Sequence, residues 1–189
     1  MHLRYSERRV IRNRNNCIME NERIVTIVSA PKDHGFKNFA EARRWAKENI
    51  VGTVKQSEIG EVNISRTAID KYLSQKAVDK SDNKDIHLSA LKIMPQIIEN
   101  SVVGEIHEDK NNIPQLSDIV RLYSAVEINK KLYRVKTTVK RYNDCSVRSK
   151  AYTYEVKEIE LLDGTLGENA SLPRTSNNSI TAAKLLQNI

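Results

Sequence analysis

The sequence predicts an α+β fold, in which two helices pack on one face of an antiparallel sheet of about four strands, preceded by a small strand–helix unit. Between residues 118 and 161, three segments alternate apolar and polar side chains, as half-buried strands do. Segments 66–74 and 86–100 instead repeat apolar residues at three- and four-residue steps, which is typical of helices. Because the helices precede the run of strands, the two kinds of element should form separate layers.

Residues 22–59 form the predicted lead-in unit. Its strand covers 22–29, and its helix covers 38–50 with Asn38 as the N-cap. Gly52 and Gly60 bracket what reads as a polar connector. A unit of this size is too small to fold alone, so we expect it to dock against the main domain, residues 60–163.

The main domain should begin with a short strand at 62–64 and a helix at 66–74 capped by Ser65. Residues 76–85 read as a loop, and a second helix at 86–100 should kink at Pro95. Strands follow at 102–107, 118–128, 131–141 and 150–161. A two-residue turn, Asn129-Lys130, should join the second and third strands.

Strand alternation assigns side chains to the two faces of this sheet. The helix-covered face should hold Val120, Leu122, Ser124, Val126 and Ile128 of one strand and Tyr133, Val135, Thr137 and Val139 of the next. In the last strand either parity is possible, and one of the two puts Tyr152, Tyr154 and Val156 on the helix-covered face. A shift of one residue in the last strand would exchange Tyr154 for Glu155 on the open face. The open face then carries Arg121, Tyr123, Arg134, Lys136, Thr153 and Glu155.

The two ends of the chain differ from this domain in composition. Residues 1–21 read as a disordered basic arm, and residues 164–189 as a flexible tail with a short terminal helix capped by Ser179. The formal net charge is +7, which favours a polyanionic partner such as nucleic acid. Two cysteines, Cys17 and Cys145, are too few for a disulfide framework or a zinc site, and no segment is apolar enough to span a membrane. We therefore expect a cytoplasmic protein.

Cations on the open face could bind a phosphate, and a tyrosine could stack on a base. A carboxylate or an imidazole could take the 2′-hydroxyl proton of RNA. These groups suffice for transesterification of RNA without a metal ion. The alternative is an exposed sheet face whose charge pairs serve only solubility.

Several blocks of the sequence resemble a known domain: ISRTAI at 64–69, HLSAL at 87–91, IIENS at 97–101, KLYRVK at 131–136 and YTYE at 152–155. They look like the nuclease-like domain of large polyvalent proteins from phages and conjugative elements. That domain is assigned to the barnase–EndoU–colicin–RelE-like superfamily. The resemblance covers about residues 60–163 and implies an RNase-like fold that acts without a metal ion. Because that superfamily varies its catalytic groups, the resemblance implies no fixed catalytic set.

The pattern and the resemblance together predict a site. The predicted catalytic residues are His87, Arg121, Arg134, Lys136 and Glu155, and the predicted substrate-binding residues are Tyr123, Thr138, Lys140 and Thr153. The arginines and Lys136 would hold the scissile phosphate, while His87 or Glu155 would act as base or acid. His107, beside Glu108 and Asp109, reads as a surface residue. We predict no metal site and no cofactor, because the four histidines share no ligand spacing.

Two functions follow from this reading. The first is a metal-independent RNA-cleaving or RNA-binding domain of phage or mobile-element origin that acts through 2′-hydroxyl attack on the adjacent phosphate. The second is a non-catalytic protein or nucleic-acid interaction module of a larger polyvalent protein. Besides RNA, a cognate inhibitor or other domains of that larger protein are candidate partners. Convergence of the three cations with His87 in one cleft would favour the enzyme.

Overall fold

The computed structural model describes residues 23–109, 113–144, 147–159 and 179–187. The predicted basic arm, most of the predicted tail and both cysteines lie outside these ranges. The described elements, in chain order, are β1 (Ile24–Ser29), α2 (Phe39–Asn49), β2 (Gly52–Gln56), β3 (Gly60–Ile64), α3 (Arg66–Tyr72), α4 (Gln75–Val78), α5 (Lys84–Lys92), α6 (Met94–Glu99), β4 (Val102–His107), β5 (Leu116–Ile128), β6 (Lys131–Tyr142), β7 (Ser149–Glu158), β8 (Ser179–Thr181) and α7 (Ala182–Leu185).

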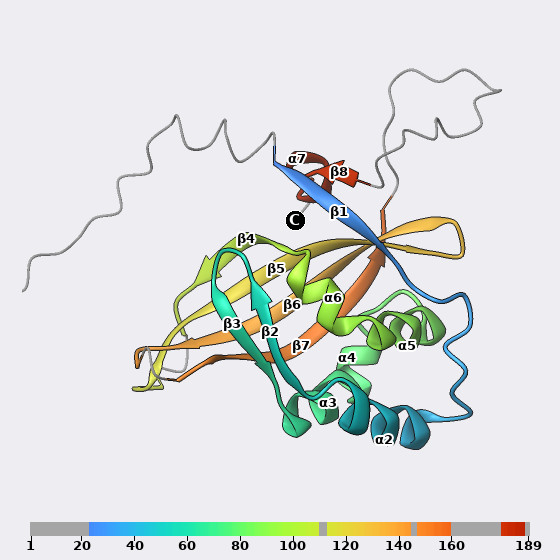
Figure 1. The fold of residues 1–189 in the computed structure, drawn as a ribbon, viewed down its shortest axis with the longest axis horizontal. Helices are drawn as coiled ribbons and strands as arrows, with labels where there is room; N and C mark the ends of the chain where they lie inside the picture. The colour runs from blue at the N-terminus through green and yellow to red at the C-terminus, as the bar shows by residue number, and fades with distance from the viewer. Residues whose placement is uncertain (1–22, 110–112, 145–146, 160–178, 188–189) are drawn as a thin grey trace, which may run out of the picture.

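One mixed sheet of eight strands contains all the described strands, in the order β2-β3-β7-β6-β5-β1-β8, with β4 also paired to β5. The predicted antiparallel sheet of about four strands is therefore wrong, although its β4-β5-β6-β7 meander forms the centre of the sheet. The pairs β1–β5 and β3–β7 are parallel. The sheet curls around the helices as part of a barrel (Figure 1).

The extra strands explain why the prediction fell short. Residues 52–56, read as part of a polar connector, form the edge strand β2, whose partner is β3. An edge strand with an exposed side carries polar residues, so its sequence lacks the apolar pattern of an inner strand. The lead-in strand β1 pairs with β5, and α2 lies against α3.

The helical layer contains more helices than the two predicted for the main domain. The described chain has five helices, α2 to α6, between β1 and β4. The predicted helix at 86–100 is divided at Ile93 into α5 and α6, with Pro95 in the first turn of α6. Proline lacks the N–H that a helix interior needs, so it starts a new helix here. Helix α4 occupies part of the predicted loop at 76–85.

The structure confirms the predicted N-caps of two helices and the predicted turn between two strands. The Asn38 side chain accepts a hydrogen bond from Glu41 N, and Ser65 Oγ accepts one from Ala68 N, so both cap their helices as predicted. Asn129 and Lys130 have φ angles of 54° and 64°, as the predicted two-residue turn requires. At the end of the chain, Thr181 rather than Ser179 caps the short helix α7.

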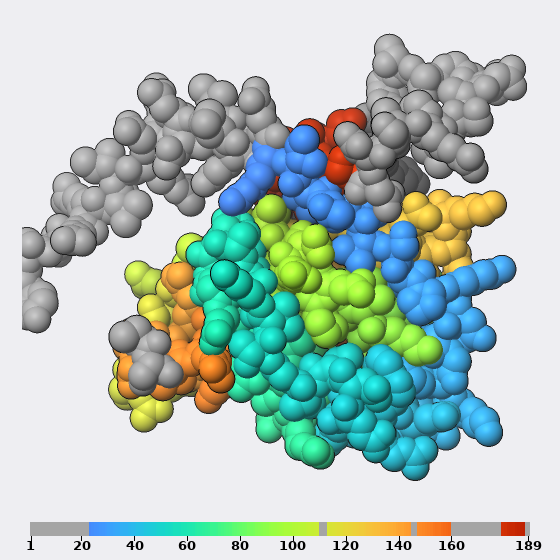
Figure 2. All heavy atoms as spheres, viewed as in Figure 1, coloured from blue at the N-terminus to red at the C-terminus, as the bar shows by residue number. Residues whose placement is uncertain are grey.

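The main core lies between the helices and the inner face of the sheet. Helix α6 packs against both β2 and β5, so the β2–β3 hairpin closes over it. In the space-filling view, the hairpin, α6 and α2 form a continuous surface (Figure 2). The inner-face residues predicted for β5 are all buried: Val120, Leu122, Ser124, Val126 and Ile128.

A second, smaller core covers part of the outer face of the sheet. Val25 of β1 and Ile180, Ala182 and Leu185 of the C-terminal segment pack over Tyr123 and Ala125. Both β5 residues are buried, whereas the predicted open face included Tyr123 as a substrate-binding residue. The reason is tertiary: β1 extends the sheet beside β5 and pairs with β8, which brings apolar side chains of β1 and of the β8–α7 segment over the outer side of β5 (Figure 1).

Strand β7 contains the register shift that the sequence left open. Val139 pairs with Ala151 and Thr138 with Thr153, so Tyr152 is an extra residue in a β-bulge. Ala151 and Tyr154 are buried, whereas Tyr152 is 37% exposed. Neither parity that the sequence allows therefore holds along the whole strand: Tyr154 and Val156 lie in the core, and the bulge turns Tyr152 away from it.

Candidate active site

The outer face of the central strands brings most of the predicted site residues together. Across β5, β6 and β7, one row is Arg121, Thr138 and Thr153, and the next is Tyr123, Lys136 and Glu155. Residues in register on adjacent strands lie side by side, and alternate residues share a face. The strand geometry therefore groups these six residues on one side of the sheet.

Two of the cations differ in their partners. Lys136 forms an ion pair with Glu155 on the next strand. The Arg121 guanidinium donates a hydrogen bond to Thr138 Oγ1, a neutral acceptor. Within the described part of the chain, no carboxylate lies within 4.0 Å of the Arg121 guanidinium. Arg121 therefore offers a positive charge that no described carboxylate neutralises.

Strand β4 adds two residues that are not among the predicted site residues. Glu105 stands opposite Arg121 in register, and His107 follows two residues later, on the same side of the strand. The Tyr123 hydroxyl donates to Glu105 Oε1 at 2.6 Å, and His107 Nε2 lies 2.5 Å from Glu105 Oε2. We call Glu105, His107, Arg121, Tyr123, Lys136 and Glu155 the outer-face cluster.

The cluster sets the protonation of its central carboxylate. Burial raises the pKa of Glu105. Hydrogen bonds from Tyr123 and His107, together with the nearby charges of His107 and Lys136, lower this pKa by more, so the net shift is downward. Burial and the Glu105 carboxylate together raise the pKa of the Tyr123 hydroxyl well above its ordinary value. At neutral pH, Glu105 is thus an anion and Tyr123 a proton donor in a hydrogen bond.

Gly104 allows Tyr123 to reach this position. It lies at the irregularity between Val103 and Glu105, where the β4–β5 register shifts. A Cβ atom on Gly104 would stand 2.5 Å from the Tyr123 ring and 2.9 Å from the Leu186 side chain. The absence of a side chain at 104 lets the tyrosine ring and the C-terminal segment pack against β4.

Arg134 lies on the same face but contacts the C-terminal segment. Its guanidinium donates to the carbonyl oxygens of Leu185 at 3.3 Å and Gln187 at 2.7 Å. It also lies over the Tyr123 ring, 5.8 Å from the ring centroid. Carbonyls at a helix C-terminus attract cations, so Arg134 anchors the end of α7 in this structure.

His87 lies on the opposite, helix-covered face and is fully buried. Its Nε2 is 2.9 Å from the Tyr72 carbonyl oxygen, and its Nδ1 is 2.8 Å from Ser81 Oγ. A carbonyl can only accept, so Nε2 carries the proton and Nδ1 accepts from the Ser81 hydroxyl. The ring also stacks on Tyr154 at 4.1 Å. Burial lowers the pKa of His87 to about 4. The sheet therefore separates His87 from the outer-face cluster.

The remaining predicted residues border the cluster. Thr138 is buried beneath the Arg121 contact, and Thr153 is half-buried beside it. The Lys140 ammonium lies over the Tyr152 ring, 4.3 Å from its centroid. Alternation at residues 105 and 107 could have indicated Glu105 and His107 from the sequence, but their closeness to Tyr123 depends on how β4 pairs with β5.

The described residues carry neither a metal site nor a membrane-spanning helix. No group of three or more histidine, cysteine, aspartate or glutamate residues there has the arrangement of a metal site. Among the same residues, no helix combines the length and apolar character of a membrane span.

Comparison with known proteins gives one family. The model of the family described as large polyvalent protein-associated domain 3 matches residues 36–152. This range runs from the loop before α2 into β7 and includes β4, β5 and β6, and with them every residue of the outer-face cluster except Glu155. No curated protein and no solved structure matches the chain. The match spans well over half of the chain, which therefore belongs to the large polyvalent protein-associated domain 3 family.

Proposed function

We propose that this domain cleaves RNA without a metal ion, at the outer-face cluster, within a larger polyvalent protein. The observation that carries the proposal is the contact of 2.5 Å between Glu105 and His107 on a solvent-accessible sheet face, next to Arg121. A carboxylate and an imidazole are a base and an acid suited to proton transfer near neutral pH. The resemblance to metal-independent RNases supports the same chemistry.

The proposed step is a transesterification within the RNA. Ionised Glu105 accepts the proton of a ribose 2′-hydroxyl, and the 2′-oxygen attacks the adjacent phosphorus. The new P–O2′ bond forms as the P–O5′ bond breaks, and protonated His107 gives its proton to the departing 5′-oxygen. The products are a 2′,3′-cyclic phosphate and a 5′-hydroxyl. The lowered pKa of Glu105 supports its ionised form, which the first proton transfer requires.

Arg121 and Lys136 would stabilise the negative charge that builds up on the phosphate. Arg121 already stands beside Glu105, and its partner Thr138 leaves the guanidinium charge unneutralised. Lys136 would have to move from Glu155 to the phosphate. A cation that already stands where charge develops, as Arg121 would, is a major source of catalysis. Glu155 would then act by orienting Lys136 in the free protein.

The proposal changes the roles inferred from sequence for two residues. His87 is buried behind the sheet, so Glu105 and His107 take over the acid–base role predicted for it. Arg134 would position the C-terminal segment and the Tyr123 ring, which it contacts. RNA remains the proposed partner, and the cytoplasm is the proposed compartment.

The test is cleavage of a labelled RNA mixture by the full chain in EDTA, followed by analysis of the new ends. We expect 2′,3′-cyclic phosphate ends from the wild-type protein, and losses of at least about 100-fold in rate for Glu105→Gln and for His107→Ala. Glu108→Gln is the matched control, because Glu108 is an exposed carboxylate next to His107 that is outside the cluster. Equal cleavage by all four proteins would contradict the site.

Absence of cleavage by the wild-type protein, with RNA still bound, would instead identify an interaction module. The structural feature that favours this second function is the ion pair between Lys136 and Glu155, because it engages a cation whose charge also acts on Glu105. In that case the cluster would serve as a docking surface, and Arg121→Ala would weaken binding without any change in RNA integrity.

A further inference from the structure

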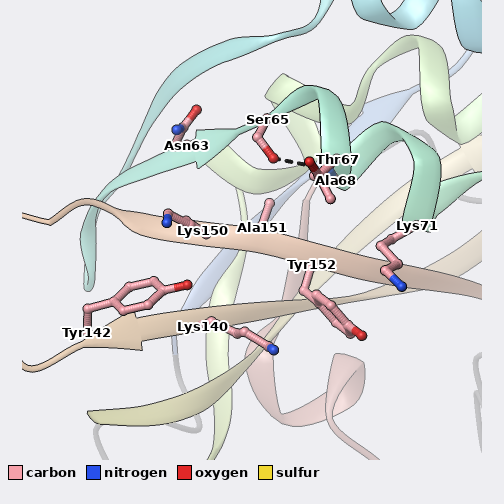
Figure 3. Close-up of a pocket in the computed structure, with 10 residues that line it drawn as sticks. All are labelled: Asn63, Ser65, Thr67, Ala68, Lys71, Lys140, Tyr142, Lys150, Ala151 and Tyr152. Carbon is pink, nitrogen blue, oxygen red and sulfur yellow. Dashed lines mark hydrogen bonds between the residues drawn. The ribbon is translucent and has the colours of Figure 1, made fainter. Parts of the chain in front are cut away.

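A pocket of about 510 Å³ lies between α3 and the outer side of β6 and β7. Figure 3 shows three lysines around it: Lys71 from α3, Lys140 from β6 and Lys150 from β7. Tyr142 and Tyr152 line the same space, and Asn63 from β3 lies at its edge. We call this the lysine–tyrosine pocket. No acidic residue lines it among those the structure describes.

The three lysines carry charge that no described carboxylate neutralises. None of their ammonium groups lies within 4.0 Å of a carboxylate in the described parts of the chain. They face aromatic rings instead: Lys140 and Lys71 lie 4.3 Å and 5.9 Å from the Tyr152 centroid, and Lys150 lies 4.7 Å from the Tyr142 centroid. Like charges in one pocket repel each other, so an anionic ligand would be bound favourably.

The β-bulge in β7 creates the aromatic part of the pocket. It turns Tyr152 outward, where the residue is 37% exposed, although a tyrosine at this position would face the core in a regular strand. Exposed tyrosines flanked by lysines are the pattern by which proteins hold single-stranded nucleic acid: the rings contact bases and the cations contact phosphates.

The pocket lies on the same side of the sheet as the outer-face cluster. The strand register runs from His107 to Ile119, from Ile119 to Lys140 and from Lys140 to Lys150. Three strand spacings separate β4 from β7, which is about 14 Å. An RNA strand that crosses the sheet could therefore contact both sites.

We propose that the lysine–tyrosine pocket binds a single-stranded segment of RNA next to the outer-face cluster. Lys71, Lys140 and Lys150 contact its phosphates, and Tyr152 stacks on one of its bases. The proposal deepens the proposed function by defining how the substrate is held, and it rests on that function only for the identity of the ligand as RNA.

The test measures binding separately from cleavage. A fluorescent single-stranded RNA with 2′-O-methyl groups throughout cannot be cleaved by 2′-hydroxyl attack, so its anisotropy reports binding by the full chain alone. We expect the triple variant Lys71→Gln/Lys140→Gln/Lys150→Gln to lower the slope of log affinity against log salt by about 2, since each lost phosphate contact on a single strand removes about 0.7. We also expect Tyr152→Ala to weaken binding by about 5- to 150-fold and Tyr152→Phe to restore it.

The matched control is Lys37→Gln/Lys55→Gln/Lys80→Gln, which removes the same charge from exposed positions outside the pocket. An equal loss of affinity in the control would reduce the effect to bulk charge and overturn the proposal. Unchanged binding by both Tyr152→Ala and the pocket triple variant, with normal melting temperatures, would also overturn it. Equal affinity of the wild-type protein for duplex RNA would contradict the single-strand preference.

Failures of the two proposals can be distinguished. If the pocket triple variant keeps the wild-type affinity and still cleaves saturating RNA, the pocket proposal is contradicted and the cluster proposal stands. If the wild-type protein binds RNA tightly through the pocket but does not cleave it, the catalytic proposal is contradicted and the pocket proposal stands.

Discussion

Two histidines on opposite faces of one sheet show how differently those faces are built. His87 is fully buried, accepts from Ser81, donates to the Tyr72 carbonyl and stacks on Tyr154. His107 has half of its side chain exposed and contacts a carboxylate, Glu105. Every polar group of the His87 ring has an internal partner, which is how proteins tolerate a buried imidazole. The His87 ring on the inner face is therefore satisfied within the fold, whereas His107 on the outer face remains partly open to solvent.

The difference has a cause in the packing. Helices α3 to α6 pack against strands on the inner face. On the outer face, among the described residues, the start of β1 and the short C-terminal segment pack over Tyr123 and Ala125. Farther along β5 and β6, the outer face carries the charged residues Arg121 and Lys140, which are partly exposed. Substitutions on the inner face should therefore change stability, and substitutions on the outer face should change ligand binding or cleavage.

The largest expected effect comes from the inner face. Leu122→Ala should lower the free energy of unfolding by about 3 kcal/mol, because it leaves a cavity at a fully buried position. Urea unfolding followed by circular dichroism measures this. Ile106→Ala is the matched control, since Ile106 is 57% exposed on β4 and its loss should cost less than about 1 kcal/mol. Equal effects of the two substitutions would contradict the assignment of the inner face.

The buried His87 should make stability depend on pH. Its pKa of about 4 in the folded protein lies below the 6.5 of an ordinary histidine, so the unfolded chain binds more protons between these values. Stability is complete above the unfolded pKa and falls as the pH drops toward the folded one. We expect a loss of about 2 kcal/mol between about pH 7 and about pH 5.

Urea unfolding at the two pH values, with His87→Gln as the comparison, measures this effect. The variant should be less stable but should lose most of the pH dependence in this range. His107→Ala should retain the dependence that comes from His87, because His87 and its buried contacts stay unchanged in this variant. The lowered pKa values of Asp82 and Glu105 act at lower pH, so they contribute little to this window. A His87→Gln variant with the full dependence would assign it to other groups.

The smallest expected effect on stability comes from the outer face. Lys136→Ala and Glu155→Ala remove the two halves of a partly exposed ion pair, so the coupling free energy from a double-mutant cycle should stay within about 1 kcal/mol. The two substitutions should nevertheless differ in RNA affinity, because Lys136→Ala removes a cation and Glu155→Ala releases one. Weaker binding by both would indicate that the ion pair itself shapes the surface.

Local chemistry allowed the sequence to predict several elements correctly. Asn38 and Ser65 cap helices through their own side chains, and Asn129-Lys130 forms the tight turn between β5 and β6. The alternation of β5 and β6 correctly assigned the inner face and brought Arg121 and Lys136 to the other side. These features depend on neighbours in the chain or on a regular period of two, both of which the sequence displays directly.

The tertiary structure alone decided the rest. The pairing of β4 with β5 brings Glu105 and His107 close to Tyr123. The bulge in β7 directs the Tyr152 side chain toward the lysine–tyrosine pocket. The cover over Tyr123 comes from a segment more than fifty residues later in the chain, which Arg134 anchors through its backbone carbonyls. Long-range pairing, a one-residue register shift and the return of a distant segment leave no local period in the sequence, because their energies depend on contacts that exist only after folding.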